Sequence, residues 1–204
     1  MYFEWIRMNI KSKTMYHTGH RELQKRFDGV KLADALEQNN NQRIFQPKDK
    51  EFIENVDFFF LATAFKESVD CSFKGGVKGF VKVTGENTLE FPDYDGNSMY
   101  RSLGNILKSP NIGMIFVEFN DQPRRLPVNG QATIREGQSG SDSKLIISVN
   151  VTEIFPNCPR YIPDLQNNKP SKYLPDERGY GAKPDWKSHK EYQNYLPKDD
   201  PHNS

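Results

Sequence analysis

The stretch from Phe91 to Leu107, FPDYDGNSMYRSLGNIL, holds the residues whose types and spacing best suit ligand chemistry. A strand-like run at 88–91 ends at a proline, and a glycine-containing turn leads into a helix predicted over 98–109. Unpaired N–H groups and the helix dipole favour anions at a helix start. Arg101, predicted one turn into this helix, can clamp a phosphate with two parallel hydrogen bonds. The pattern indicates an anion site, with a capped helix bearing a surface arginine as the alternative.

Charge and composition exclude several classes of partner. The chain has 204 residues and a formal net charge of +1, with lysine and arginine scattered along it, so neither nucleic acid nor a membrane surface is expected as a partner. No apolar run approaches the ~18 residues of a membrane-spanning helix, and the N-terminus lacks the apolar region of a secretory signal. A cytoplasmic protein is therefore expected. The length predicts one domain with appendages.

Cysteine and histidine spacing predicts neither a disulfide scaffold nor a metal centre. Cys71 and Cys158 are far apart in the chain and are expected as free thiols. His17 and His20 have the spacing of a ligand pair, but no third ligand has a defined spacing to them. We therefore predict no metal site.

Hydrophobic periodicity places helices before a series of strands. A helix is predicted over 18–41 with a break at Asp28-Gly29, and a second over 47–55 with Phe52 and Ile53 buried. Strands are predicted at 58–64, 69–73, 80–83, 88–91, 112–119, 126–134 and 144–155. Six or seven hairpin-connected strands with one inserted helix are typical of a small antiparallel barrel.

The chain divides into four segments on this basis. Residues 1–14 form an N-terminal extension or frayed arm, with Met15 as an alternative start, and residues 15–56 form the N-terminal helices. Residues 57–156 form the barrel core. Residues 157–204 are rich in Pro, Asn, Lys and Asp but carry spaced tyrosines and a tryptophan. This C-terminal segment is expected to pack on the barrel or on a partner subunit.

Five motifs in order resemble the pyridoxamine 5′-phosphate oxidase-related flavoproteins. They are MYHTGHRELQKRFD, DCSFKGGVKGFVKV, FPDYDGNSMYRSLGNILKSPNIGMIFVEF, RRLPVNGQATI and FPNCPRYI, and the resemblance runs from about Met15 to Pro201. It implies a mainly β fold, a six-stranded antiparallel split β-barrel with flanking helices that binds FMN. It also implies a homodimer with the flavin at the subunit interface.

The same resemblance implies eight cofactor-binding residues in three segments. They are Ser72 and Lys74 on a strand near the ring and ribityl chain, Asn97, Arg101, Ser102 and Asn105 at the turn and helix that receive the phosphate and ribityl hydroxyls, and Arg160 and Tyr161, which reach the partner's cofactor. A cation at the Lys74 position stabilises anionic reduced flavin. Each position also has an ordinary alternative: an outward strand residue, a solvated charge, a surface ion pair, a strand cap for Asn105 or a dimer salt bridge for Arg160. Cys71 is expected to point opposite to Ser72, into the barrel.

The residues set limits on the chemistry. No Ser–His–Asp set or paired carboxylate is visible, so a bound flavin would carry the reaction, and the lack of a GxGxxG fingerprint favours FMN over FAD. Pro127 implies an edge or bulge in its strand, and the substrate-binding signature of true pyridoxamine phosphate oxidases is not recognisable. The expected function is an FMN-dependent oxidoreductase acting on a small-molecule substrate or electron donor. A non-catalytic flavin-binding protein and a deazaflavin-dependent reductase remain as alternatives.

Overall fold

The computed structural model describes residues 14–94, 98–137, 143–166, 185–196 and 198. The chain divides into two units, residues 1–40 with 183–204, and residues 41–182. Each unit is described by itself below. Within the described residues, no helix combines the length and apolar character that crossing a membrane requires.

The first unit contains short helices. Helix α2 spans Thr18–Arg26 and α3 spans Val30–Asn40, and the predicted break between them is confirmed, with Asp28 in a left-handed conformation (φ 52°). The 3-10 helix η1, Asp185–Ser188, and helix α6, Lys190–Gln193, belong to the same unit. His17 Nδ1 accepts from the Gly19 N–H at 3.1 Å, and His20 Nδ1 accepts from the His17 N–H at 3.2 Å. The histidine pair therefore caps α2.

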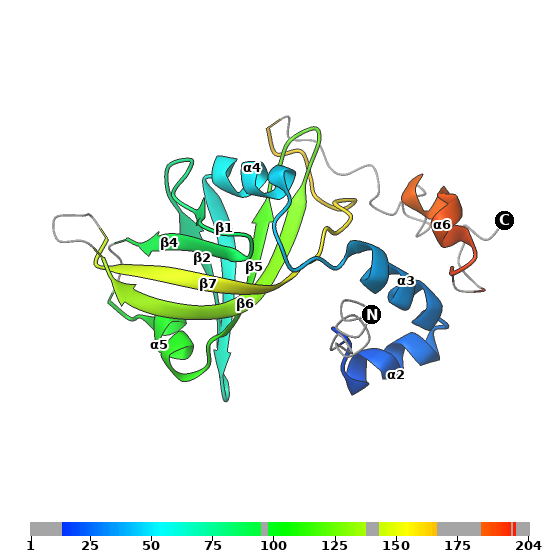
Figure 1. The fold of residues 1–204 in the computed structure, drawn as a ribbon, viewed down its shortest axis with the longest axis horizontal. Helices are drawn as coiled ribbons and strands as arrows, with labels where there is room; N and C mark the ends of the chain where they lie inside the picture. The colour runs from blue at the N-terminus through cyan, green and yellow to red at the C-terminus, as the bar shows by residue number, and fades with distance from the viewer. Residues whose placement is uncertain (1–13, 95–97, 138–142, 167–184, 197, 199–204) are drawn as a thin grey trace, which may run out of the picture. The chain divides into compact units, whose positions relative to one another are not determined.

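The second unit is built on an antiparallel sheet, which confirms the predicted mainly β architecture with flanking helices (Figure 1). Its elements in chain order are α4 Pro47–Asn55, β1 Phe58–Phe65, β2 Ser68–Gly75, β3 Lys82–Val83, β4 Thr88–Asp93, α5 Arg101–Lys108, β5 Asn111–Val117, β6 Arg125–Glu136 and β7 Leu145–Ile154. The spatial order is β2-β1-β5-β6-β7-β4-β3. The sheet has seven strands, one for each predicted segment, rather than the six that the family resemblance implies. The segment predicted at 80–83 forms the short β3, in which Lys82 and Val83 pair with Glu90 and Leu89.

The ladders of the described strands form an open series, with β2 and β3 at its two ends. Strand β3 is only two residues long and stops opposite Glu90, so the end of β4 at Asp93 pairs only with Leu145 of β7. The side of β4 away from β7 is thus unpaired at Asp93. An open edge of this kind leaves room for side chains and a ligand where a closed barrel would have a ladder.

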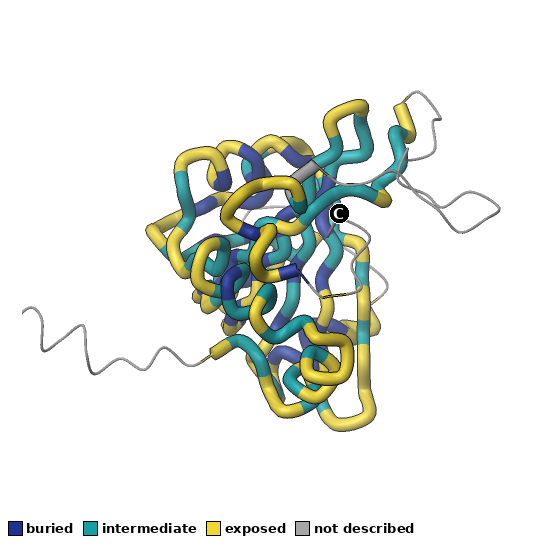
Figure 2. Tube along the Cα trace, turned by 90° about the vertical axis from the view of Figure 1, so that its right-hand side faces the viewer, coloured by how far each residue is buried: buried dark blue, intermediate teal, exposed yellow. Residues whose placement is uncertain are grey.

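The core lies inside the curved sheet and is closed by two helices. Its largest fully buried side chains are Phe59, Leu61, Leu89, Phe91, Phe116, Leu126, Ile147 and Ile154. Phe52 and Ile53 of α4 are buried as predicted, and Leu103 and Ile106 of α5 join the same cluster. Figure 2 shows buried and exposed stretches alternating along the chain. Within the strands the burial follows the period of two, as in β1, where Phe59, Leu61 and Thr63 are buried.

Strand β6 carries an irregularity close to Pro127. The β6–β7 ladder begins at Val128 opposite Ile154, so Pro127 lies just outside it. Pro127 pairs with Ile115 of β5, and its carbonyl accepts from the Phe155 N–H at 3.2 Å. A register shift follows between Asn129 and Gly130. The proline, which has no N–H to donate, therefore lies at the end of one ladder and beside a bulge, as its residue type predicts.

Candidate functional site

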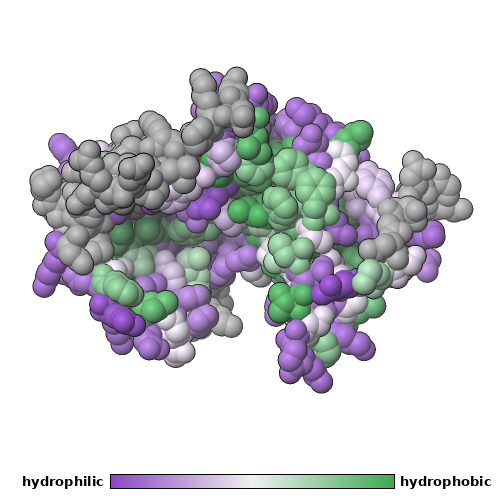
Figure 3. Space-filling view, turned by 180° about the vertical axis from the view of Figure 1, so that it is seen from behind, coloured by the Kyte–Doolittle hydropathy of each residue, from purple (hydrophilic) through white to green (hydrophobic). Residues whose placement is uncertain are grey.

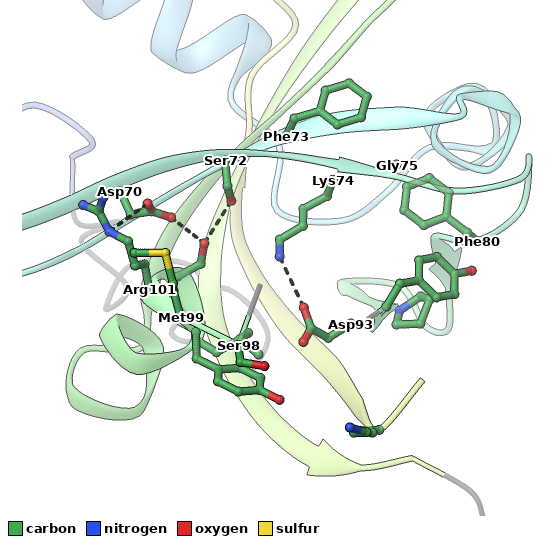
Figure 4. Close-up of a pocket in the computed structure, with 16 residues that line it drawn as sticks. Asp70, Ser72, Phe73, Lys74, Gly75, Phe80, Asp93, Ser98, Met99 and Arg101 are labelled. Atoms are coloured by element: carbon green, nitrogen blue, oxygen red, sulfur yellow. Dashed lines mark hydrogen bonds and ion pairs between the residues drawn. The ribbon is translucent and has the colours of Figure 1, made fainter. Parts of the chain in front are cut away.

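A pocket of about 430 Å³ lies between β2, the end of β4 and the start of α5 (Figure 4). This volume falls in the range of roughly 300–1,000 Å³ that is common for small-molecule and cofactor sites. The residues that line it are Asp70, Ser72, Phe73, Lys74, Gly75, Phe80, Pro92, Asp93, Tyr94, Ser98, Met99, Tyr100, Arg101, Ser102, Leu103 and Lys144. The pocket therefore occupies the open edge of the sheet.

Strand β2 supplies one wall of the pocket through alternate residues. Asp70, Ser72 and Lys74 extend into it, while the Phe73 ring points to the other side of the strand (Figure 4). The expectation that Cys71 points into the barrel is wrong, because Cys71 is exposed on the side opposite to Ser72. The side of β2 that faces the pocket is therefore polar, since it carries Asp70, Ser72 and Lys74.

The start of α5 supplies the opposite wall. Ser98 and Tyr100 have φ values of 61° and 49°, and such left-handed residues cannot belong to a right-handed helix. The helix therefore begins at Arg101 and not at Ser98 as predicted, so Arg101 is its first residue rather than one turn in. The first intrahelical bond runs from the Gly104 N–H to the Tyr100 carbonyl at 2.6 Å. The N–H groups of residues 101–103 thus have no partner within the helix. Asn97 lies outside the described residues.

Two serines and an aspartate form a hydrogen-bonded network in the middle of the pocket wall. The Ser102 hydroxyl donates to Asp70 Oδ2 at 2.5 Å, and the Ser72 and Ser102 oxygens are 2.9 Å apart. Asp70 Oδ1 also faces Arg101 Nε at 3.6 Å, and Arg101 Nη2 donates to the Val69 carbonyl at 3.2 Å. This network joins β2 to the first turn of α5.

A second ion pair crosses the open edge of the sheet. Lys74 Nζ donates to Asp93 Oδ1 at 3.3 Å, and both side chains are mostly buried, with 22% and 15% of their surface exposed. Lys74 belongs to β2 and Asp93 to β4, which no ladder connects. A side-chain contact thus bridges the strands on either side of the pocket.

The net charge of the described lining is positive. Three cationic side chains, Lys74, Arg101 and Lys144, line the pocket with two carboxylates, Asp70 and Asp93, which gives 3 − 2 = +1. The site can therefore attract one anionic group. Each carboxylate already pairs with one of the cations.

The other predicted residues lie away from the pocket. Asn105 is buried, and its Nδ2 donates to Thr63 Oγ1 at 3.2 Å and to the Ser68 carbonyl at 3.3 Å, so it caps strand backbone, which was the ordinary alternative for this position. Arg160 and Tyr161 follow β7 and do not line the pocket of this chain. The Arg160 guanidinium lies 5.3 Å from the centre of the Tyr161 ring.

The structure thus brings together four of the eight predicted residues, Ser72, Lys74, Arg101 and Ser102, and adds others that the sequence reasoning missed. Asp70 lies two residues before Ser72, so the period of two in a strand could have identified it. Asp93 and Lys144 come from separate strand ends, and nothing in their local sequence marks them. No group of three or more metal-ligating side chains occurs in the described parts of the chain.

Comparison with known proteins gives structural neighbours only. No protein-family model matches the chain, and no curated protein matches it. An FMN-binding protein from Syntrophomonas wolfei is similar over 68% of this chain and 96% of its own, with 12% identity and a TM-score of 0.42. HupZ from Group A Streptococcus is similar over 63% and 99%, with 16% identity and a TM-score of 0.43. An F420 reductase is similar over 52% and 94%, with 20% identity and a TM-score of 0.38.

Proposed function

We propose that the pocket binds FMN and that the protein is a flavin-dependent oxidoreductase acting on a small molecule. The observation that carries the proposal is the change in lining along the pocket. Arg101, Asp70 and Ser72 lie at one end, and Gly75 and Phe80 at the other (Figure 4). A ligand with a flat apolar ring and an anionic polar chain fits such a lining. The sequence motifs support the same ligand class.

The residues present fit the parts of this cofactor. Arg101 and the N–H groups at the start of α5 that have no partner within the helix would hold the phosphate. Lys74 would provide positive charge for the reduced ring, and its ion pair with Asp93 keeps its side chain in the pocket. When bound, the flavin supplies hydride and electron transfer. The protein's part is to bind it, orient it and stabilise its charge.

The cofactor released from purified protein tests this proposal. Mass spectrometry of the released material should show FMN, because the pocket offers charge for one terminal phosphate and the sequence has no GxGxxG motif for a pyrophosphate. The purified protein should show the visible bands of oxidised flavin, and NADH or NADPH should bleach them. A predominance of FAD, or a protein that binds no flavin, would overturn the proposal.

A non-catalytic flavin-binding protein is the second candidate. It is favoured by the described lining, which holds neither histidine nor cysteine, and by the pairing of both aspartates with cations. Such a protein would bind FMN but resist bleaching by either nucleotide. A deazaflavin-dependent reductase uses the same kind of anion site and would instead bind and turn over a deazaflavin cofactor.

We further propose that the protein is a homodimer, with the flavin between subunits and Arg160 and Tyr161 reaching the partner's pocket. Support comes from the outer aromatic surface, which we define as Phe58, Phe60, Phe73 and Phe119, whose ring centres lie 5.2–6.1 Å apart in successive pairs. Phe73 is 62% exposed, and Val69, on the same side of β2, is 66% exposed. Figure 3 shows hydrophobic atoms gathered on the face seen from behind. Exposed apolar groups of this kind favour association.

A further inference from the structure

The hydrogen bonds of the serine–aspartate network have a direction that the side chains themselves determine. As a carboxylate, Asp70 only accepts hydrogen bonds, so the 2.5 Å contact with Ser102 uses the Ser102 proton. A hydroxyl has one proton, and Ser102 therefore accepts in its 2.9 Å contact with Ser72. The Ser72 proton is used in that contact. Neither serine hydroxyl thus has a proton left to donate into the pocket.

The Ser72 oxygen therefore offers a ligand only its lone pairs, which accept hydrogen bonds. Among the described residues it has no partner other than Ser102, and it lines the pocket. The dianionic phosphate of a phosphate ester has only acceptor oxygens and cannot donate a hydrogen bond to it. A ligand hydroxyl can donate to it.

We infer that Asp70 is a positioning residue that makes Ser72 offer only hydrogen-bond acceptors, so this part of the pocket binds a hydroxyl of the ligand's polyol chain and excludes its phosphate. The identity of that chain as the ribityl group of a flavin rests on the proposed function. The direction of the network does not. The phosphate is then left to Arg101 and the start of α5, and Ser102 does not contact it.

Replacing Asp70 by asparagine should reverse the direction of the network. Arg101 Nε–H faces the Oδ1 position at 3.6 Å, so the amide oxygen takes that position and the amide nitrogen faces Ser102. The amide then donates to Ser102, Ser102 donates to Ser72, and the Ser72 proton turns into the pocket. Ser72 becomes a donor that can bind phosphate.

Asp93→Asn is the matched control, because it also removes one negative charge from the pocket lining and frees a cation but leaves the serines unchanged. The probe is methyl phosphate at about pH 8, where it is a dianion without a P–OH donor, titrated into flavin-free protein and followed by NMR. Both variants should bind phosphate more tightly than the parent, and Asp70→Asn should gain about 2- to 10-fold more than Asp93→Asn from the new hydrogen bond. Adding Ser72→Ala to Asp70→Asn should remove that extra gain. Equal gains in the two single variants, or an extra gain that survives Ser72→Ala, would overturn the inferred direction.

A flavin titration tests the hydroxyl contact. Ser72→Ala should weaken riboflavin binding about 2- to 10-fold and leave lumiflavin, which has the ring without the hydroxyl chain, unchanged. Equal effects on both ligands would overturn the hydroxyl assignment. If no flavin binds the parent protein, the proposed function and the ribityl assignment fail, and the phosphate titration still decides the direction of the network. Thermal unfolding of each variant shows that the fold is kept.

Discussion

Arg101 is held in place before any ligand arrives. Its Nε lies 3.6 Å from Asp70, its Nη2 donates to the Val69 carbonyl, and its side chain is still 56% exposed. A cation that is already oriented loses less conformational entropy when it binds an anion. The residue is therefore the main candidate for the phosphate contact, although its partner Asp70 reduces the positive charge around it.

Arg101→Ala should weaken FMN binding by about 1.5–3 kcal/mol, because it removes a charge-assisted hydrogen bond to the phosphate and leaves Asp70 without its cation. The measurement is a fluorescence titration of flavin-free protein. Arg135→Ala is the matched control, since it removes an exposed arginine that pairs with Glu90 outside the pocket lining, and it should leave the affinity unchanged. Equal affinities of the Arg101 variant and the parent would show that the phosphate lies elsewhere.

At the scale of elements, the bulge of β6 depends on a glycine. A Cβ atom on Gly130 would lie 2.6 Å from the Asn150 carbonyl oxygen and 2.7 Å from Val149 Cγ1. The backbone oxygen belongs to the neighbouring strand β7 and cannot move without disturbing the ladder. The close approach of the two strands at this position therefore excludes a side chain.

Gly130→Ala should lower the free energy of unfolding by about 1–3 kcal/mol, as overpacking does in other well-packed interiors. Gly104→Ala in α5 is the control, because its added Cβ would meet no heavy atom within 4 Å. That change should raise the free energy of unfolding by about 0.5–1 kcal/mol, since alanine is the better helix former. Chemical denaturation of both variants gives the comparison, and a Gly130 variant as stable as the parent would refute the steric argument.

Glu90 forms side-chain hydrogen bonds that link three neighbouring strands. On β4, it accepts from the Ser148 hydroxyl of β7 and from Arg135 Nη2 of β6, the latter at 2.7 Å. The hydrogen bond from Ser148 and then that from Arg135 hold the pKa of the Glu90 carboxyl below its ordinary value. A carboxyl whose pKa is lowered on folding stabilises the fold above its unfolded pKa, and this stabilisation is lost as the pH falls through the folded pKa.

Glu90→Gln should therefore lower the free energy of unfolding by about 0.5–1 kcal/mol at pH 7. The value is modest because the hydrogen bonds and the ion pair of Glu90 lie near the surface. The difference from the parent should begin to shrink near the ordinary glutamate pKa of 4.5 and vanish at lower pH. Urea denaturation over a pH series measures it, with the exposed Glu136→Gln as the control. A difference that stays constant down to pH 2 would contradict this pKa shift.

Element types were predictable from the sequence, and the exact geometry of the site was not. The period of two and the apolar runs predicted the strands, and Pro47 marked the start of α4. The predicted start of α5 was wrong, because Ser98 and Tyr100 adopt left-handed conformations that their residue types do not reveal. The predicted orientation of the Cys71 side chain on β2 was also wrong, because the sequence does not show which side of an end strand faces a pocket.

At the scale of the whole molecule, the outer aromatic surface makes the oligomeric state testable. Phe60 lies on β1 within this surface and does not line the pocket. A glutamate there would place a charge where a second copy is proposed to pack. If the flavin is held by both chains, dimer and ligand stabilise each other by mass action.

Phe60→Glu should convert the proposed dimer to a monomer at micromolar concentration and weaken flavin binding with it. Sedimentation velocity with and without flavin, over a dilution series, measures both effects. Val69→Glu should act in the same direction from an exposed position that tolerates a charge, while Leu23→Glu, on a similarly exposed residue of α2, should change nothing. A parent protein that is monomeric with flavin bound would remove the dimer from the proposal.

The different roles of the two sides of β2 restrict which sequence changes this strand can accept in evolution. Asp70, Ser72 and Lys74 serve the pocket, and Val69, Cys71 and Phe73 cover the opposite side. Single substitutions can alter the pocket without altering the proposed dimer surface, or the reverse, because the two sets occupy alternate positions. Inserting or deleting one residue exchanges the two sets at once. This strand is therefore expected to vary in composition among descendants while keeping its length.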